Sequence, residues 1–303
     1  MSRIRRPRAK PKARQVNPFL WLLPLAVVLS AVVMWLATQS SEQTADLFWK
    51  PSVEKPRYSA GTGPVVCVDE AHRNYHIIAG RYAPFARLLE ADGYTVRPFR
   101  QTVRGAAITA CRVLVIANAT AELETDGIER WVRDGGSLLL IADHTPYAEA
   151  AESTGAAFGF RMSKGFVADI RMGEDLFVKS NGTLTQHAVT EGLDRIRTFL
   201  GQAITAPADA TPILILGKGY RVWKAREAFN RRMVEDSESA EGLCQLAVKQ
   251  HGRGRIAVSG EAAMFSAQID PGLMRQPMGM NAPGAEQNAL FALNLMRWLE
   301  GAR

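Results

Sequence analysis

The chain has 303 residues and a formal net charge of +7, from 37 basic and 30 acidic side chains. Seven basic residues and no acid lie in residues 1–14, so the other 30 basic side chains balance the 30 acidic ones. The net charge therefore comes from the tail and does not indicate a basic domain face, so we expect no nucleic-acid partner. The 47% hydrophobic content is ordinary for a globular protein with a real core.

An uncharged segment, Phe19–Ala37, follows this basic tail of residues 1–18. As a helix it would measure about 28 Å, close to the ~30 Å hydrocarbon core of a bilayer. Its tryptophans, Trp21 and Trp35, lie near the two ends, where indoles favour the interface. The positive charges before it predict a cytoplasmic N-terminus. We therefore expect a single-pass inner-membrane protein with a periplasmic or extracellular domain; a cleaved signal peptide is the alternative.

Residues 38–63 are expected to form a stalk, because Pro51 and Pro56 interrupt any helix and Gly61 and Gly63 favour a flexible entry to the domain. The domain itself is expected to cover residues 64–303. Its first half alternates apolar runs with helical patterns. The predicted strands are Val65–Val68, Tyr94–Phe99, Arg112–Ala117 and Ser137–Ala142. The predicted helices are Arg81–Ala91, Glu122–Asp134 and Tyr147–Phe158.

The second half is less regular. Residues 166–190 suggest a meander of short strands. Strand-like runs follow at Pro212–Leu216, Leu243–Lys249 and Arg255–Ser259, the last two joined by a hairpin turn, and Gln287–Glu300 is expected to be a helix. Alternating strands and helices predict an α/β fold with a mostly parallel sheet flanked by helices.

In such a sheet, ligands bind at the carboxyl ends of the strands. Three loops at predicted strand ends carry polar residues of catalytic or binding type. These candidates are Asp69, Glu70, His72, Asn74 and His76 after the first strand, Asp143 and His144 after the fourth, and Glu261 after Arg255–Ser259. We expect these three loops to meet at one edge, with Asp69, His72, Asn74 and His144 in ligand binding.

A metal site is one hypothesis for this edge. His72 and His76 are four residues apart, so one helical turn would place both imidazoles on one face. Asp69 would complete a set of ligands for a divalent metal, with Asp143 or His144 as alternatives. Glu261 or Glu70 would then act as general base.

Nucleophilic catalysis has less support. The chain has no Gly-x-Ser-x-Gly elbow, and Asp143 stands at the elbow-like position, as a carboxylate nucleophile or as a helix cap. Cys67, Cys111 and Cys244 each lie in or beside a strand-like run and are expected to be small buried hydrophobes. Their odd number argues against a full disulfide framework, although one pair could bridge.

The chain resembles the class I glutamine amidotransferase-like superfamily, on stretches that run in order through residues 64–299. It looks most like an uncharacterised bacterial family related to the gliding-motility ABC-transporter auxiliary component, and more distantly like trehalose-utilisation-type domains. The stretches that carry the resemblance are residues 68–74, 80–85, 92–94, 135–144, 187–193, 252–261 and 288–299.

The resemblance implies a flavodoxin-like fold. True amidotransferases place a cysteine at the elbow and a His-x-Glu late in the chain, and this sequence has neither. It therefore implies a domain without amidotransferase activity that binds a ligand or a partner, such as an envelope or transporter protein. A metal-dependent hydrolase acting on an envelope substrate is the alternative.

Overall fold

The computed structural model describes residues 24–30, 42–103, 106–169, 175–223, 237–271 and 275–301. It divides the chain into two compact units, Met1–Glu42 and Gln43–Arg303. In the first unit, residues 24–30 are helical with exposed side chains. The rest of the predicted segment Phe19–Ala37 lies outside the described residues. Among the residues that the structure does describe, no helix has both the length and the apolar character to cross a bilayer.

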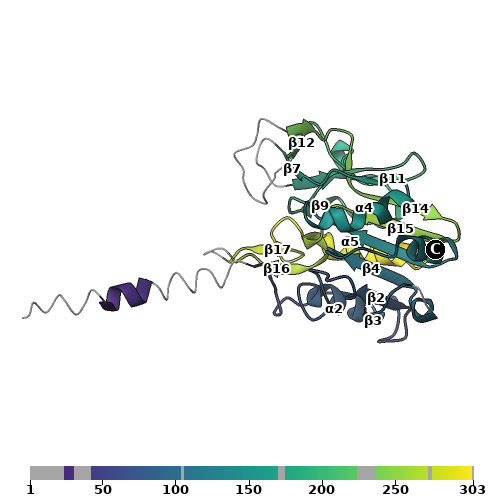
Figure 1. Ribbon diagram of the computed structural model, residues 1–303, viewed down its shortest axis with the longest axis horizontal. Helices are drawn as coiled ribbons and strands as arrows, with labels where there is room; N and C mark the ends of the chain where they lie inside the picture. Colours follow the sequence, from purple (N-terminus) through teal and green to yellow (C-terminus); the bar gives the residue numbers. More distant parts are fainter. Residues whose placement is uncertain are drawn as a thin grey trace, which may run out of the picture. The chain divides into compact units, whose positions relative to one another are not determined.

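The second unit is built on a nine-stranded sheet with the order β3-β2-β4-β5-β15-β14-β10-β6, and β11 also pairs with β14 (Figure 1). The first five of these strands run parallel to one another. Their bounds are β3 Thr95–Phe99, β2 Val65–Asp69, β4 Val113–Ala117, β5 Ser137–Ile141 and β15 Gly254–Ser259. Each predicted strand of this group is confirmed to within a residue, as is the α/β fold with a parallel sheet.

Helices cover both faces of the sheet. On one face α2 (Ala83–Ala91) and α5 (Asn288–Leu299) bury Phe85 and Phe291 against the side chains of alternate strand residues, such as Val66 and Val68. On the other face lie α3 (Thr125–Arg133) and α4 (Tyr147–Ala157), which pack against the intervening residues. Strands buried on both faces explain why the sequence shows continuous apolar runs there.

The remaining described strands form antiparallel pairs. In the large sheet they are β14 Cys244–His251, β11 Thr211–Ile215, β10 Ile204–Thr205 and β6 Arg161–Met162. Smaller sheets contain β7 Phe166–Asp169, β12 Tyr220–Trp223 and β13 Ser237–Ser239; β8 Asp175–Val178 and β9 Arg195–Thr198; and β1 Thr44–Ala45, β16 Ala267–Ile269 and β17 Pro277–Gly279. The predicted hairpin between β14 and β15 is confirmed, because His251 pairs with Gly254. The predicted meander is confirmed only as short strands: β7 and β8 pair with β12 and β9, not with each other.

The expected stalk needs correction, because the compact second unit begins at Gln43. Strand β1 pairs with β16, and Tyr58 packs edge-on against Tyr94 with ring centroids 5.6 Å apart. A Cβ added at Gly93, which has a φ of 92°, would lie 2.3 Å from the Tyr58 carbonyl oxygen, so this glycine permits the close approach. Prolines prevented a helix here but did not prevent an extended segment from packing on the domain.

Candidate functional site

The carboxyl ends of β2, β4, β5 and β15 meet at one edge of the sheet, because these strands are parallel neighbours. This confirms the expectation that the segments after Val68, Ala142 and Ser259 share an edge. Since β4 lies between β2 and β5, the loop after β4 also belongs to this edge. We call it the carboxyl edge.

Asp143 is the residue that ties three of these loops together. Its Oδ2 accepts a hydrogen bond from Asn118 Nδ2 at 2.7 Å, and its Oδ1 accepts one from the Ala262 amide at 3.1 Å. In return, the Asp143 amide donates to Asn118 Oδ1 at 2.9 Å. Asn118 has a φ of 50°, in the left-handed region, which asparagine tolerates better than most residues. Asp143 therefore holds the loops after β4, β5 and β15 in register.

Glu261 is a second acid at the same edge, only 1% exposed. Its two oxygens accept hydrogen bonds from the Ala263 and Met264 amides at 2.7 and 2.8 Å. Burial raises the pKa of Glu261 well above its ordinary value, and the charge of Asp143 raises it further. Burial also raises the pKa of Asp143, against the opposing Asn118 hydrogen bond, although part of this residue reaches the surface. The two acids therefore hold protons more tightly than acids in water.

His72 lies between two carboxylates. Its Nδ1 is 2.9 Å from Asp69 Oδ2 and its Nε2 is 3.1 Å from Glu124 Oε2, and the residue is 4% exposed. The hydrogen bond to Asp69 raises the pKa of His72, while burial opposes the rise. Both ring nitrogens can donate only in the imidazolium, so this geometry favours the charged form. The His72 carbonyl also accepts from the Thr120 and Ala121 amides, which pins the loop after β2 onto the loop after β4.

His76 has the opposite environment. It is 3% exposed, and its ring packs 4.7 Å from the Tyr82 ring and 5.6 Å from the Tyr75 ring. Burial, with the nearby charge of Arg81, lowers the pKa of His76 to about 3. Its Nδ1 has no hydrogen-bond partner among the described residues. His76 is therefore a neutral core histidine.

Three further predicted site residues have local partners. Glu70 pairs with Arg100 at 2.9 Å and accepts a hydrogen bond from the Ile78 amide. Both oxygens of this carboxylate, which was proposed as a base, are therefore engaged. Asn74 Oδ1 accepts from the His72 amide at 3.1 Å. The His144 ring lies 3.8 Å from the Phe166 ring and its Nδ1 is 2.7 Å from the Thr145 carbonyl oxygen.

The predicted metal set needs correction. The segment of residues 71–76 is not helical, so His72 and His76 do not share a helix face as expected. In the part of the chain that the structure describes, no group of three His, Cys, Asp or Glu side chains is placed to hold a metal ion. The His72 nitrogens face Asp69 and Glu124 instead, while His76 is buried against aromatic rings.

The sequence reasoning missed three residues of this edge. Asn118 follows β4 directly, so the strand-end rule that selected the other loops also applied to it. Glu124 precedes α3, and no local pattern links it to His72. Gln202 Nε2 donates to the Ala142 carbonyl at 2.7 Å and to the Asp143 carbonyl at 3.1 Å, from a segment far away in the sequence.

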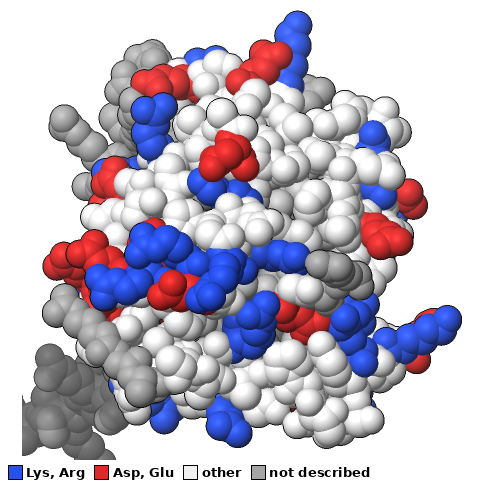
Figure 2. Space-filling model, turned by 90° about the vertical axis from the view of Figure 1, so that its right-hand side faces the viewer, with Lys and Arg blue, Asp and Glu red and all other residues white. Residues whose placement is uncertain are grey.

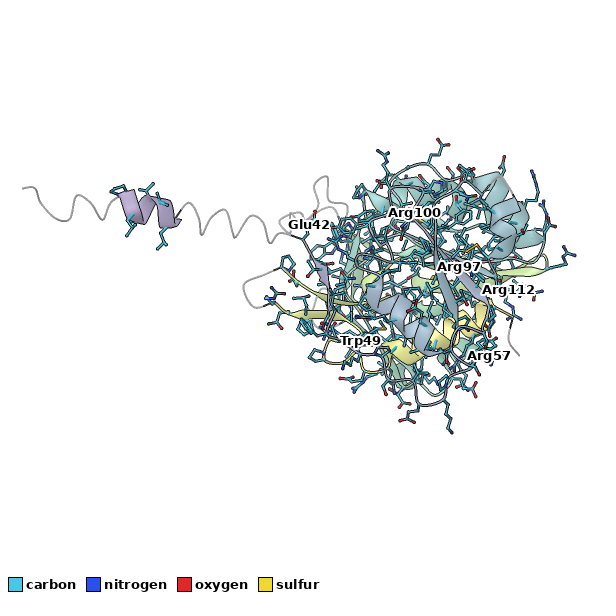
Figure 3. All side chains as sticks on the ribbon, turned by 90° about the horizontal axis from the view of Figure 1, so that it is seen from below. Glu42, Trp49, Arg57, Arg97, Arg100 and Arg112 are labelled. Carbon is cyan, nitrogen blue, oxygen red and sulfur yellow. A yellow bond between two sulfur atoms is a disulfide. The ribbon has the colours of Figure 1, made fainter. Side chains whose placement is uncertain are left out.

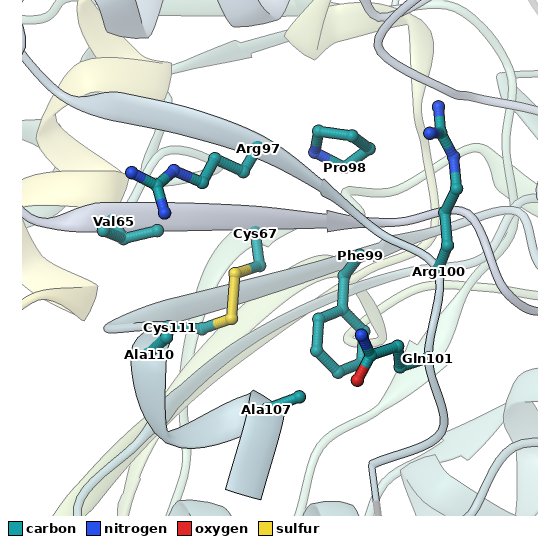
Figure 4. Close-up of a pocket in the computed structure, with 10 residues that line it drawn as sticks. All are labelled: Val65, Cys67, Arg97, Pro98, Phe99, Arg100, Gln101, Ala107, Ala110 and Cys111. Atoms are coloured by element: carbon teal, nitrogen blue, oxygen red, sulfur yellow. A yellow bond between two sulfur atoms is a disulfide. The ribbon is translucent and has the colours of Figure 1, made fainter.

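For the cysteines, the alternative of one bridged pair is the one that the structure shows. Cys67 and Cys111 form a disulfide, and they are not independent buried thiols. The bridge forms part of the wall of an open hollow of about 160 Å³ beside the edge strand β3, together with Arg97 and Phe99 (Figure 4). Cys244, in β14, keeps a free thiol that is 1% exposed, and burial raises its pKa to about 12. A thiol with this environment is unreactive at neutral pH.

Comparisons with known proteins describe the fold only. The mmIFT52 N-terminal domain has a TM-score of 0.58 and 12% identity, over 78% of this chain and 97% of that one. A cytoplasmic protein, STM1381 from Salmonella typhimurium LT2, has a TM-score of 0.48 and 11% identity, over 78% and 99% of the two chains. A ThuA-like protein from Parabacteroides merdae ATCC 43184 has a TM-score of 0.47 and 12% identity, over 79% and 91%.

At these identities the first comparison shows a shared fold, and the two with lower TM-scores carry no argument. No family model matches this chain, and neither does any curated protein.

Proposed function

We propose that the protein is a membrane-anchored extracytoplasmic domain of the glutamine amidotransferase-like fold, which binds a ligand or partner and does not hydrolyse glutamine. The main support for this proposal is the position of Asp143 and its hydrogen bonds. It occupies the turn after β5, where amidotransferases place a cysteine, and both of its carboxylate oxygens accept hydrogen bonds from the chain itself. The remaining free thiol, Cys244, is buried at the first residue of β14, and not at a turn from a strand into a helix.

The strand order supports the flavodoxin-like part of this proposal. Numbered along the chain, the five parallel strands have the spatial order 2-1-3-4-5, which is the flavodoxin-like arrangement. In that arrangement ligands bind outside the carboxyl ends, where the strand order reverses. Here the reversal falls between β2 and β4, at the loops that carry His72 and Asn118.

The disulfide supports an extracytoplasmic location. Disulfides persist in oxidising compartments and are rare in the reducing cytosol. The Cys67–Cys111 bridge joins β2 to the residue two positions before β4, and both cysteines are buried. Together with the basic tail and the uncharged segment Phe19–Ala37, it favours a domain outside the cytoplasmic membrane.

Aromatic side chains at the carboxyl edge support ligand binding. Tyr75 and Tyr147 have ring centroids 5.4 Å apart, His144 lies 6.3 Å from Tyr147, and Phe166 lies 3.8 Å from His144. All four residues are partly exposed. They lie in or beside the loops of the carboxyl edge, one of which contains Asp143. Partly exposed rings beside a carboxylate provide both an apolar contact and a polar one for a small ligand.

The surface charge is consistent with the absence of a nucleic-acid partner, which stays a prediction. On the face that Figure 2 shows, a band of Lys and Arg crosses the surface with Asp and Glu beside it. Ion pairs on the described surface include Arg133 with Glu129 at 3.0 Å and Arg195 with Glu286 at 3.6 Å. Such pairs reduce the local field that attracts phosphates.

The enzymatic part of the proposal is tested with the full chain in lipid nanodiscs supplied with glutamine. We expect no ammonia release above that of a heat-inactivated sample. Release that disappears in Asp143→Ala would overturn the proposal.

The binding part is tested by thermal unfolding against a panel of amino acids, sugars and short peptidoglycan fragments. We expect at least one compound to raise the melting temperature of the wild type but not of Tyr147→Ala. The control variant Glu90→Ala, at an exposed position of α2, should respond as the wild type does. A panel without any stabilising compound contradicts ligand binding at this edge.

Location is tested with alkaline phosphatase fused after Arg303 in a bacterial host. This reporter folds only where disulfides form. An active fusion is expected; an inactive but intact fusion contradicts the extracytoplasmic location.

A further inference from the structure

A short loop beside β1 presents two large apolar side chains to solvent. Leu47 is 64% exposed and Phe48 is 93% exposed. In the described part of Gln43–Arg303, the other large hydrophobic residue with high exposure is Leu290, at 39%, and it stands alone. Exposing a phenylalanine almost completely is costly in water, so adjacent exposed apolar residues indicate a contact surface.

The loop is held in this conformation by specific hydrogen bonds. Asp46 Oδ1 accepts from the amides of Phe48 and Trp49 at 3.0 and 3.1 Å, which fixes the turn. Asp46 Oδ2 accepts from Asn281 at 3.0 Å. On α2, Arg87 donates to the Leu47 carbonyl at 2.9 Å and to the Asp46 carbonyl at 3.0 Å. The exposure of Leu47 and Phe48 is therefore a built feature of the fold.

The next residue, Trp49, has its side chain turned toward the domain. Trp49 is partly buried and packs against the main core cluster, on the side of the domain where Figure 3 labels it. Trp49 therefore attaches the loop to the domain, while the Phe48 side chain is exposed to solvent. Lys50 follows and is exposed. An aromatic residue, a leucine, a tryptophan and a lysine in a row have the composition of interfacial membrane contacts.

Chain length limits where this loop can lie. Leu47 comes ten residues after Ala37, the end of the expected membrane segment. Ten residues span at most about 35 Å. If Ala37 lies at the outer interface of a bilayer, the loop therefore stays near that surface. The acid nearest to the two apolar residues, Asp46, is already engaged by hydrogen bonds, so its charge is not presented to the lipid.

We propose that Leu47 and Phe48 insert into the outer leaflet of the membrane that anchors the chain and fix the orientation of the domain on it. This inference rests on the membrane anchor of the proposed function. The occupant is the lipid surface itself, because the tether keeps the loop beside it. Insertion of two side chains to a depth of about 5–10 Å is the usual mode of such interfacial contacts.

The test uses the full chain in phosphatidylcholine–phosphatidylglycerol vesicles, labelled at Phe48→Cys with an environment-sensitive fluorophore. The native thiols do not compete, because two are in the disulfide and Cys244 is buried. A second sample carries the label at Arg130→Cys, an exposed position of α3, which packs on the other face of the sheet. Half of the vesicles contain lipids with a nitroxide near the headgroup.

We expect the nitroxide lipid to reduce emission from position 48 by roughly half and to leave position 130 unchanged. In a Phe48→Asp background, a label at Leu47→Cys should lose most of its quenching. Emission typical of water without quenching at position 48 would overturn the proposal. A blue-shifted emission without quenching would show a protein partner there, which also overturns it.

Failure of the anchor is recognised separately. A chain that does not float with the vesicles contradicts the membrane anchor and, with it, this inference. A chain that floats but shows no quenching at position 48 contradicts this inference alone.

Discussion

Removing the Cys67–Cys111 disulfide is expected to lower the free energy of unfolding by about 4 kcal/mol. The two cysteines are 44 residues apart in the sequence. For a loop of this length, cross-linking removes about 13 cal/mol/K of entropy from the unfolded chain, or about 4 kcal/mol at 25 °C. Both residues are nearly buried, at 4% and 6% exposed, so replacing them with serine would add a cost of burying hydroxyls.

The measurement compares urea unfolding of the wild type, the variant Cys67→Ser/Cys111→Ser, and the wild type under reducing conditions. With a slope of about 3 kcal/mol/M, the unfolding midpoint should fall by roughly 1.3 M upon reduction and by more in the variant, which also buries two hydroxyls. The control Cys244→Ser retains the bridge and a donor for the Ile204 carbonyl, and reduction should still shift its midpoint. Denatured, unreduced wild type should contain one reactive thiol for each chain, from Cys244.

Equal midpoints with and without reductant would refute the reasoning, since a bridge that constrains the unfolded chain must act on stability. Three reactive thiols in the unreduced protein would refute the disulfide itself, and the support that it lends to an extracytoplasmic location would fall as well.

Three further predictions concern ionisable groups. The pKa of His72 is raised above 6.5, so the stability that its charged imidazole contributes is fully present below that pH and is lost as the pH rises through the folded pKa. The variant His72→Leu leaves Asp69 without this partner. It should lower the free energy of unfolding in urea by about 3 kcal/mol at pH 5 and by clearly less at pH 8.5. An equal cost at both pH values would contradict an imidazolium. At pH 5 His76 takes up a proton in the unfolded chain but not in the folded one, so the free energy of unfolding of the wild type should be about 2 kcal/mol lower at pH 5 than at neutral pH. His76→Phe should remove this acid sensitivity. The pKa of Glu261 is raised well above 4.5, so the stability that its protonated form contributes is present below that pH and is lost as the pH rises through the folded pKa. Glu261→Gln should therefore flatten the dependence of stability on pH above 4.5, whereas Glu90→Gln, at an exposed position, should not.

The exposed loop of Asp46–Trp49 and the carboxyl edge are made of different residues and are proposed to address different partners. The first is proposed to meet lipid and the second a ligand or a protein. Because each has its own variants, Phe48→Asp for the loop and Tyr147→Ala for the edge, loss of one function does not imply loss of the other.

The parallel half of the fold was predictable from the sequence because its signals are local. A strand buried on both faces must be a continuous apolar run, and a helix beside it must repeat its apolar residues at helical spacing. Residues 65–158 follow both rules. The direction of parallel strands then places Asp69, Asp143 and Glu261 at one edge without any knowledge of contacts.

The tertiary structure alone decided which of these residues meet. Besides Asp69, three residues away, His72 meets Glu124, 52 residues away. The partner of Cys67 is Cys111, because β2 lies beside β4. Spacing along the chain carries no information about such pairs. Residues 43–63 of the expected linker are likewise part of the compact second unit, since an extended segment of ordinary composition shows its strand pairing only when β16 lies beside it. Local sequence set the elements and their polarity, whereas side-chain partners depended on distances that folding alone creates.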